Sequence, residues 1–208
     1  MTPPMFSVSN LSKRYDDRVL FAQLSFAAER GCIALTDEQG SGKSTFLRIV
    51  AGAAGADAGE VLLDGQPLKD GTSARLVYVP EDFPEYPTDT GRAFLARIAA
   101  ERGAALDEEI LALADDFALT PHLDKRFEQM SFGTRKKFFF TATAIGRVDV
   151  VIADEPTSGL DAPSRAALAR LFQALGEDRV VLFTSYDEGL VHACGAKVIG
   201  FADMTAPR

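Results

Sequence analysis

The 208-residue sequence has only two cysteines, Cys32 and Cys194, too few for a disulfide framework and typical of a reducing compartment. We expect both to be buried as small hydrophobic residues. No apolar run approaches the roughly 18 residues that a membrane span needs, and residues 1–10 have no basic region followed by an apolar core. Basic residues are also in deficit, because 22 Lys and Arg face 30 Asp and Glu, which gives a net charge of −8. This charge argues against broad nucleic-acid binding, so we expect no nucleic-acid partner.

Short apolar strands alternate with helices over most of the chain. Strands are expected in the first thirty residues and at 32–36, 60–63, 75–80, 148–153, 180–184 and 197–201, and helices at 43–51, 162–176 and 187–194. Such alternation implies a parallel sheet that is covered on both faces. Between 81 and 145, a proline-containing loop leads into a helical pattern with Pro121 as a break, which indicates a helical insertion in an α/β domain.

A glycine-rich loop joins the strand at 32–36 to the helix that follows. Its glycines let backbone N–H groups turn toward phosphate oxygens, and the helix N-terminus favours an anion. Lys43 would reach the β- and γ-phosphates, and the hydroxyl of Ser44 would bind Mg²⁺. Asp37 stands where the strict pattern has glycine. Because aspartate visits left-handed conformations more easily than most residues, we expect the turn to survive, although a carboxylate near phosphates could weaken nucleotide binding. The candidate phosphate-binding residues are Gly40, Ser41, Gly42, Lys43, Ser44 and Thr45.

Two adjacent carboxylates follow the apolar strand at 148–153. The carboxyl end of a buried parallel strand opens into the crevice where α/β proteins bind ligands, so Asp154 and Glu155 are expected there. Asp154 would hold Mg²⁺ through water, and Glu155 would act as the general base on the attacking water.

With these two sites, the chain resembles the ATP-binding subunits of ABC transporters over essentially its whole length. Five further segments match in order and spacing: Tyr15, 77–81, 130–134, 158–161 and 184–187. The resemblance implies a P-loop NTPase fold with a mainly parallel core, an N-terminal antiparallel β subdomain and an inserted helical subdomain. It also implies one ATP-binding domain, with 1–82 and 146–208 as its core and 83–145 as the helical part.

The resemblance also assigns roles to single residues. Tyr15 would stack on adenine, and Glu81, in place of the family's glutamine, would sense Mg²⁺ and the attacking water. Ser131 and Gly133 belong to residues 130–134, the segment that matches the family's signature, and would face the γ-phosphate held by a second subunit. Asp161 would complete the family's D-loop, which is residues 158–161 here, and Tyr186 stands in place of the switch histidine. Basic side chains at 135–137 would raise the positive potential at the signature, unless they merely form a solvated helix face.

Several positions depart from the family pattern: Asp37, Glu81, Phe132, Thr134 and Tyr186. Two explanations stay open, a slow but real ATPase and a degenerate half of an asymmetric pair. A non-hydrolysing nucleotide-dependent regulator and a soluble ATPase of DNA repair or translation are further alternatives, the last disfavoured by the acidity and by the lack of long insertions.

The implied ligands and partners are ATP, Mg²⁺, a second ATP-binding subunit and a separate transmembrane permease. The chain would then lie at the cytoplasmic face of a membrane. Phe83 and Tyr86, in the loop at 81–90, are candidate permease contacts, although both could instead fold onto the domain's own core. His122 and His192 are expected to be structural or solvent-facing.

Overall fold

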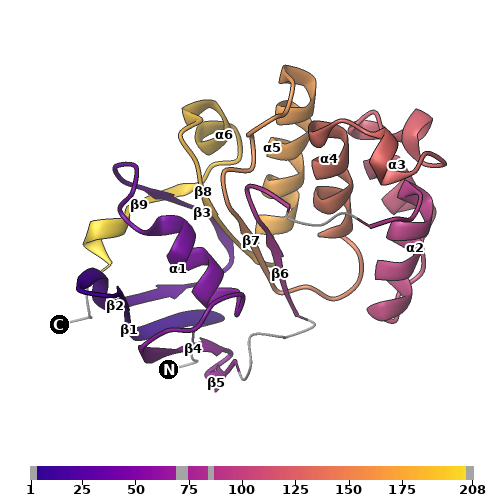
Figure 1. The fold of residues 1–208 in the computed structure, drawn as a ribbon. Coiled ribbons are helices and arrows are strands. Elements are labelled where there is room, and N and C mark those ends of the chain that lie inside the picture. The colour runs from indigo at the N-terminus through magenta and orange to yellow at the C-terminus, as the bar shows by residue number, and fades with distance from the viewer. Residues whose placement is uncertain (1–3, 69–74, 84–86, 205–208) are drawn as a thin grey trace.

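The computed structural model describes residues 4–68, 75–83 and 87–204. Two sheets and a group of helices form the molecule (Figure 1). Tyr86 lies outside the described residues, so its expected permease contact has no structural counterpart. Within the described ranges, no helix is long and apolar enough to cross a bilayer.

A five-stranded parallel sheet forms the centre, in the order β6-β7-β8-β3-β9. Its strands are β3 (Gly31–Thr36), β6 (Leu76–Val79), β7 (Val150–Ala153), β8 (Val180–Thr184) and β9 (Lys197–Gly200). The predicted strands at these places are confirmed, to within a residue or two at their ends. β7 and β8 are buried along their whole length, as expected of strands covered on both faces.

Alternate residues of each central strand point to opposite faces, and each face has its own core. Val150 and Ile152 pack in one hydrophobic cluster, together with α1 (Lys43–Val50) and the second sheet. Val151 and Ala153 pack in the other, together with α5 (Ala162–Gly176) and the remaining helices. The prediction of a sheet covered on both faces is therefore confirmed.

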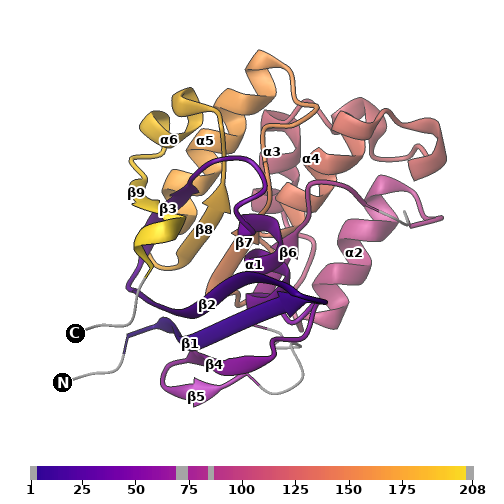
Figure 2. The same ribbon diagram turned by 60° about the vertical axis from the view of Figure 1, so that its left-hand side comes forward.

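The second sheet is antiparallel and has the order β2-β1-β4-β5. It comprises β1 (Phe6–Tyr15), β2 (Arg18–Ala28), β4 (Ala58–Leu63) and β5 (Gln66–Pro67). Helix α1 lies between the two sheets, as the turned view makes clear (Figure 2). This arrangement places the beginning of α1, and the loop before it, at the upper rim of the parallel sheet.

Helices from the middle of the chain lie to one side of α5 (Figure 1). They are α2 (Gly91–Glu101), α3 (Glu108–Asp116) and α4 (Phe132–Ala142), and short 3-10 turns at Thr120–His122 and Phe127–Gln129 separate α3 from α4. Each of the three helices begins at a side-chain cap, from Thr90, Asp107 and Ser131 respectively. The expected helical insertion and the break at Pro121 are both present.

Both cysteines are free and buried, as expected. Cys32 is the second residue of β3, and Cys194 is the C-cap of α6 (Glu188–Ala193). They belong to the same hydrophobic cluster, so they act as small apolar residues of the core.

Candidate nucleotide-binding site

The loop between β3 and α1 has the backbone that an anion site requires. Gly40 and Gly42 have φ of 82° and 102°, in the left-handed region that glycine tolerates. A Cβ on Gly42 would also lie 2.9 Å from Cγ of Leu20. Gly42 is the N-cap of α1 and supplies no capping side chain, so the first N–H groups of the helix remain available to a ligand.

Lys43 is folded back over this loop. Its Nζ donates to the carbonyl oxygens of Asp37 and Glu38, at 2.8 and 2.9 Å, and to Oγ of Ser41 at 3.3 Å. The ring of Tyr186 lies 5.3 Å from the same Nζ, in cation–π contact. The ammonium group therefore lies at the mouth of the loop, where phosphate oxygens would compete with the two carbonyl oxygens for its N–H donors.

The turn at Asp37 forms without the left-handed conformation that aspartate could have supplied. Its φ is not positive, and its carboxylate accepts from the N–H of Glu38 at 2.7 Å. Asp37 instead contributes its backbone carbonyl to Lys43, which any residue could do. The glycine of the family pattern is therefore not required by this backbone. The side chain lines a different cavity, beside His192 and Val198.

A hydroxyl and a carboxylate oxygen meet beside the loop, as a magnesium site requires. The Oγ of Ser44 donates to Oδ1 of Asp154 at 3.1 Å. Oδ1 also accepts from Oγ1 of Thr184 at 2.7 Å. Asp154 is 4% exposed and follows β7 directly. Oxygen donors of this kind suit Mg²⁺, which keeps several waters when it binds through one carboxylate. The residues present therefore fit the ion.

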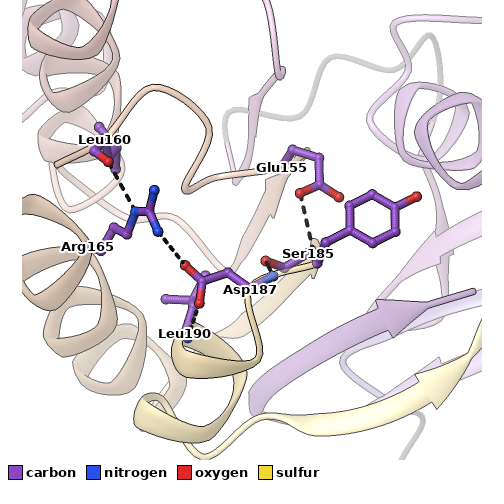
Figure 3. Close-up of polar contacts among 7 residues, drawn as sticks. Glu155, Leu160, Arg165, Ser185, Asp187 and Leu190 are labelled. Carbon is purple, nitrogen blue, oxygen red and sulfur yellow. Dashed lines mark hydrogen bonds and ion pairs between the residues drawn. The ribbon is translucent and has the colours of Figure 1, made fainter. Parts of the chain in front are cut away.

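Glu155 is held at its backbone and at its side chain. Its φ is +40°, which is strained for a residue with a Cβ. Its N–H donates to Oγ1 of Thr184 at 3.0 Å, and its carbonyl accepts from Nζ of Lys136 at 2.8 Å. One carboxylate oxygen accepts from the N–H of Tyr186 at 3.4 Å (Figure 3). Burial raises the pKa of this carboxyl above its ordinary value.

Tyr186 contacts Glu155 through its backbone, not through its phenol. The side chain is 58% exposed, and its ring faces Lys43. The contact between this position and the carboxylate therefore does not depend on which side chain stands here. His192 is exposed, as expected, and His122 is half-buried.

An arginine connects the D-loop to the segment that contains Tyr186. Nε of Arg165 donates to the carbonyl of Leu160 at 3.0 Å, and its other end pairs with Asp187 at 3.4 Å (Figure 3). Asp187 also caps α6 by accepting from the N–H of Leu190. Asp161 similarly caps α5, because its carboxylate accepts from the N–H of Ser164 at 3.0 Å. Hydrogen bonding with the side chain of Ser164, and then with its N–H, lowers the pKa of Asp161.

The signature segment begins α4 and packs on the chain's own D-loop. Ser131 caps the helix, since its Oγ accepts from the N–H of Thr134 at 3.2 Å. A Cβ on Gly133 would lie 2.3 Å from the carbonyl oxygen of Gly159, so no larger residue fits. The ring of Phe132 lies against Gly159 as well. Phe132 thus fills space inside the subunit.

Lys136 contradicts the expectation that residues 135–137 form either a positive patch or a solvated face. Its side chain is 0% exposed, and Nζ donates to three backbone carbonyls. Desolvation lowers its pKa to about 8. Lys136 lies four residues before the buried Phe140 on α4, and residues at that spacing share one face of a helix. That geometric signal could have identified it from the sequence.

Part of the expected site lines one cavity of about 950 Å³. Its lining includes Gly40, Gly42, Lys43, Ser44, Thr45, Glu81, Glu155 and Tyr186. Thr184, which sequence reasoning did not assign to the site, also lines it. Tyr15, Ser131, Gly133 and Asp161 lie outside this lining, and Tyr15 is 50% exposed with Lys13 against its ring.

The parallel sheet, the glycine-rich loop and the acidic strand end define a P-loop nucleotide-binding protein. Residues 21–158 match the sequence model of the ABC transporter family, so the chain belongs to that family.

Named relatives support the assignment. The chain is 32% identical to the Fe(3+) ions import ATP-binding protein FbpC of Pseudomonas fluorescens, over 80% of this chain and 48% of that protein. It is 28% identical to the Nod factor export ATP-binding protein I of Ralstonia nicotianae, over 88% and 60%. The chain thus spans about half to three fifths of the length of these relatives.

Solved structures share the fold. A putative ABC transporter ATP-binding protein from Pyrococcus furiosus superposes with a TM-score of 0.81 at 18% identity, over 97% of this chain and 99% of that one. An ATP-bound bacterial Atm1-family exporter gives 0.78 at 22% identity, over 99% of this chain and 40% of that chain.

Proposed function

We propose that the chain binds and hydrolyses Mg-ATP as one subunit of a dimer that drives a separate membrane permease. The observation that carries the proposal is that Lys43, Ser44 and Glu155 line the same cavity. Asp154 lies beside it and is hydrogen-bonded to Ser44. Membership of the ABC transporter family supports it, since ATP-binding subunits of that family are generally ATPases.

The binding step uses the loop and the two magnesium ligands. The N–H groups at the start of α1 and the ammonium of Lys43 would take the phosphate oxygens, after Lys43 leaves the carbonyls that it now contacts. Ser44 and Asp154 would hold Mg²⁺, with Glu81 near it in the cavity. Bound Mg²⁺ would neutralise charge on the β- and γ-phosphates.

The hydrolytic step uses Glu155 as general base. Its carboxylate would accept a proton from water while the water oxygen attacks the γ-phosphorus, and the bond to the β-phosphate oxygen would break to release ADP. The raised pKa makes Glu155 a better proton acceptor than an ordinary carboxylate. Tyr186 would keep the carboxylate in place through its N–H, with its ring over Lys43.

The remaining candidate residues suit a second subunit. Ser131, Gly133 and Asp161 lie outside the subunit's own cavity, at the start of α4 and α5. They would complete the site of a partner copy, and Tyr15 would stack on adenine. Residues 83–145 would form the helical subdomain that docks on the permease at the cytoplasmic face. Phe83 is stacked on Phe139 at 4.0 Å between ring centroids, which favours packing on the domain's own core over permease contact.

The test compares purified wild-type chain with Lys43→Ala, Glu155→Gln and an exposed control, Lys125→Ala. Lys43→Ala should weaken Mg-ATP binding by at least about ten-fold, because it removes the charge in the loop. Glu155→Gln should keep binding but lower phosphate release by about 100-fold or more. It should also accumulate as an ATP-dependent dimer in light scattering.

Each alternative gives a different result. Unchanged affinity in Lys43→Ala would contradict the phosphate-loop assignment. ATP binding without phosphate release by the wild type would favour the regulatory subunit or the degenerate half of a pair. Affinity purification of Glu155→Gln from gently solubilised membranes with Mg-ATP should also recover a protein with several membrane spans. If no such protein is recovered, the proposed partnership with a permease is wrong.

A further inference from the structure

The amine of Lys136 joins α4 to two segments that are far apart in the sequence, the loop after β6 and the turn at residues 155–158. Nζ donates to the carbonyl of Glu155 at 2.8 Å, of Ser158 at 3.3 Å and of Glu81 at 3.4 Å. Glu155 is the candidate base, Ser158 begins the D-loop at 158–161, and Glu81 lies in the loop after β6. An ammonium group has three N–H donors, and each has one acceptor here. The side chain is fully buried.

We propose that Lys136 is a positioning residue that sets the orientation of Glu155 and couples it to the loop after β6, to the D-loop and to α4. The proposal rests on the proposed ATPase function, because it assigns a role within that same site. Lys136 itself does not reach the cavity in which the phosphates would bind.

The contact with Glu155 acts at the strained point of its backbone. With φ at +40°, this residue keeps its conformation only because its surroundings fix it. Lys136, at 2.8 Å, and the N–H of Ser158, at 3.1 Å, both bond to the carbonyl oxygen of the residue, and Thr184 fixes its N–H side. Rotation of that carbonyl would redirect the peptide plane and move the carboxylate away from the cavity.

Burial and nearby charge act on this amine in opposite directions, and desolvation, the larger effect, lowers its pKa to about 8. Carboxylates of Glu81, Asp82, Glu155 and Asp154 lie near enough to oppose the loss of its proton. The ring of Phe132 also lies 5.6 Å from Nζ, in cation–π contact. Phe132 in turn packs against the D-loop at Gly159. Movement of the start of α4 would therefore reach Glu155 through one buried side chain.

Lys136→Met keeps the length of the side chain and removes every donor, whereas Lys136→Gln keeps two N–H groups. Lys136→Met should lower kcat at least about ten-fold while the dissociation constant for Mg-ATP changes less than about three-fold, since the phosphate-binding groups are untouched. Lys136→Gln should lie between Lys136→Met and the wild type. Lys125→Met, exposed in the same helical region, should match the wild type. A kcat of Lys136→Met within two-fold of the wild type would overturn the proposal.

A second measurement needs no nucleotide and therefore separates this proposal from the proposed function. Hydrogen–deuterium exchange of folded Lys136→Gln should rise together in residues 80–83 and 154–160, and Lys125→Met should show no change. Faster exchange confined to α4, or no change at all, would overturn the coupling even if the wild type proved not to hydrolyse ATP. Absence of ATP turnover in the wild type, with coupled exchange intact, would overturn only the proposed function.

Discussion

Thr184→Val removes one hydroxyl that holds both carboxylate residues of the site. The Oγ1 atom donates to Oδ1 of Asp154 at 2.7 Å and accepts from the N–H of Glu155 at 3.0 Å. The residue is 1% exposed, so no water is expected to replace the lost contacts. Valine has nearly the same shape, which confines the perturbation to these two hydrogen bonds.

The magnitude follows from the two bonds. The bond to the ionised carboxylate contributes about 1.5–3 kcal/mol and the neutral bond about 1 kcal/mol. The added methyl group of valine offsets up to about 0.8 kcal/mol. A net loss of about 2–3 kcal/mol remains, which in a domain of this size lowers Tm by about 4–12 °C. Because Glu155 also loses the anchor of its N–H, kcat should fall by about ten-fold or more.

Thermal unfolding and steady-state phosphate release would measure both effects, and Thr184→Ser is the matched control. Serine keeps the hydroxyl and loses a methyl group, so its kcat should stay close to that of the wild type. If Thr184→Val and Thr184→Ser have equal kcat and equal Tm, the hydroxyl does not hold the carboxylates as argued.

Three further substitutions test separate parts of the site and fold. Gly133→Ala would place a Cβ 2.3 Å from the carbonyl oxygen of Gly159, so we expect a loss of about 1–3 kcal/mol in urea unfolding and a lower kcat. Asp107→Ala removes the cap of α3 and should cost about 1 kcal/mol, with kcat unchanged because α3 lies away from the site. Tyr186→Phe should lower kcat less than about three-fold, because the contact with Glu155 uses the backbone N–H. A ten-fold fall in Tyr186→Phe would mean that the phenol acts on the substrate.

Local patterns predicted the elements and the phosphate loop well. The path from β3 through Gly42 to α1 is encoded within a few residues, so the sequence identifies it without knowledge of the rest of the chain. The position of Asp154 at the end of β7 was equally accessible, because an apolar strand that ends in an acid is a short-range signal.

Thr184 could not be identified in this way, because its role depends on strand order. β7 and β8 are neighbours, and Ala153, the last residue of β7, is paired with Phe183, one residue before the end of β8. The next residue of each strand therefore meets the other, and Asp154 contacts Thr184. The alternation of strands and helices predicts a parallel sheet, but it does not say which strands are adjacent.

The placement of Glu155 shows why a motif alone does not specify a base. One local group, the N–H of Ser158, bonds to its carbonyl. Three further groups that fix this residue lie 19, 29 and 31 positions away along the chain: the amine of Lys136, the hydroxyl of Thr184 and the N–H of Tyr186. A left-handed backbone at a glutamate costs about 1–3 kcal/mol, and these contacts offset that strain. Two of the three distant groups come from β8 and the residues just after it and one from α4, so the orientation of the base depends on the sheet and the helix together. The departure from the family at Tyr186 leaves this arrangement intact because the contribution of that position is a backbone N–H.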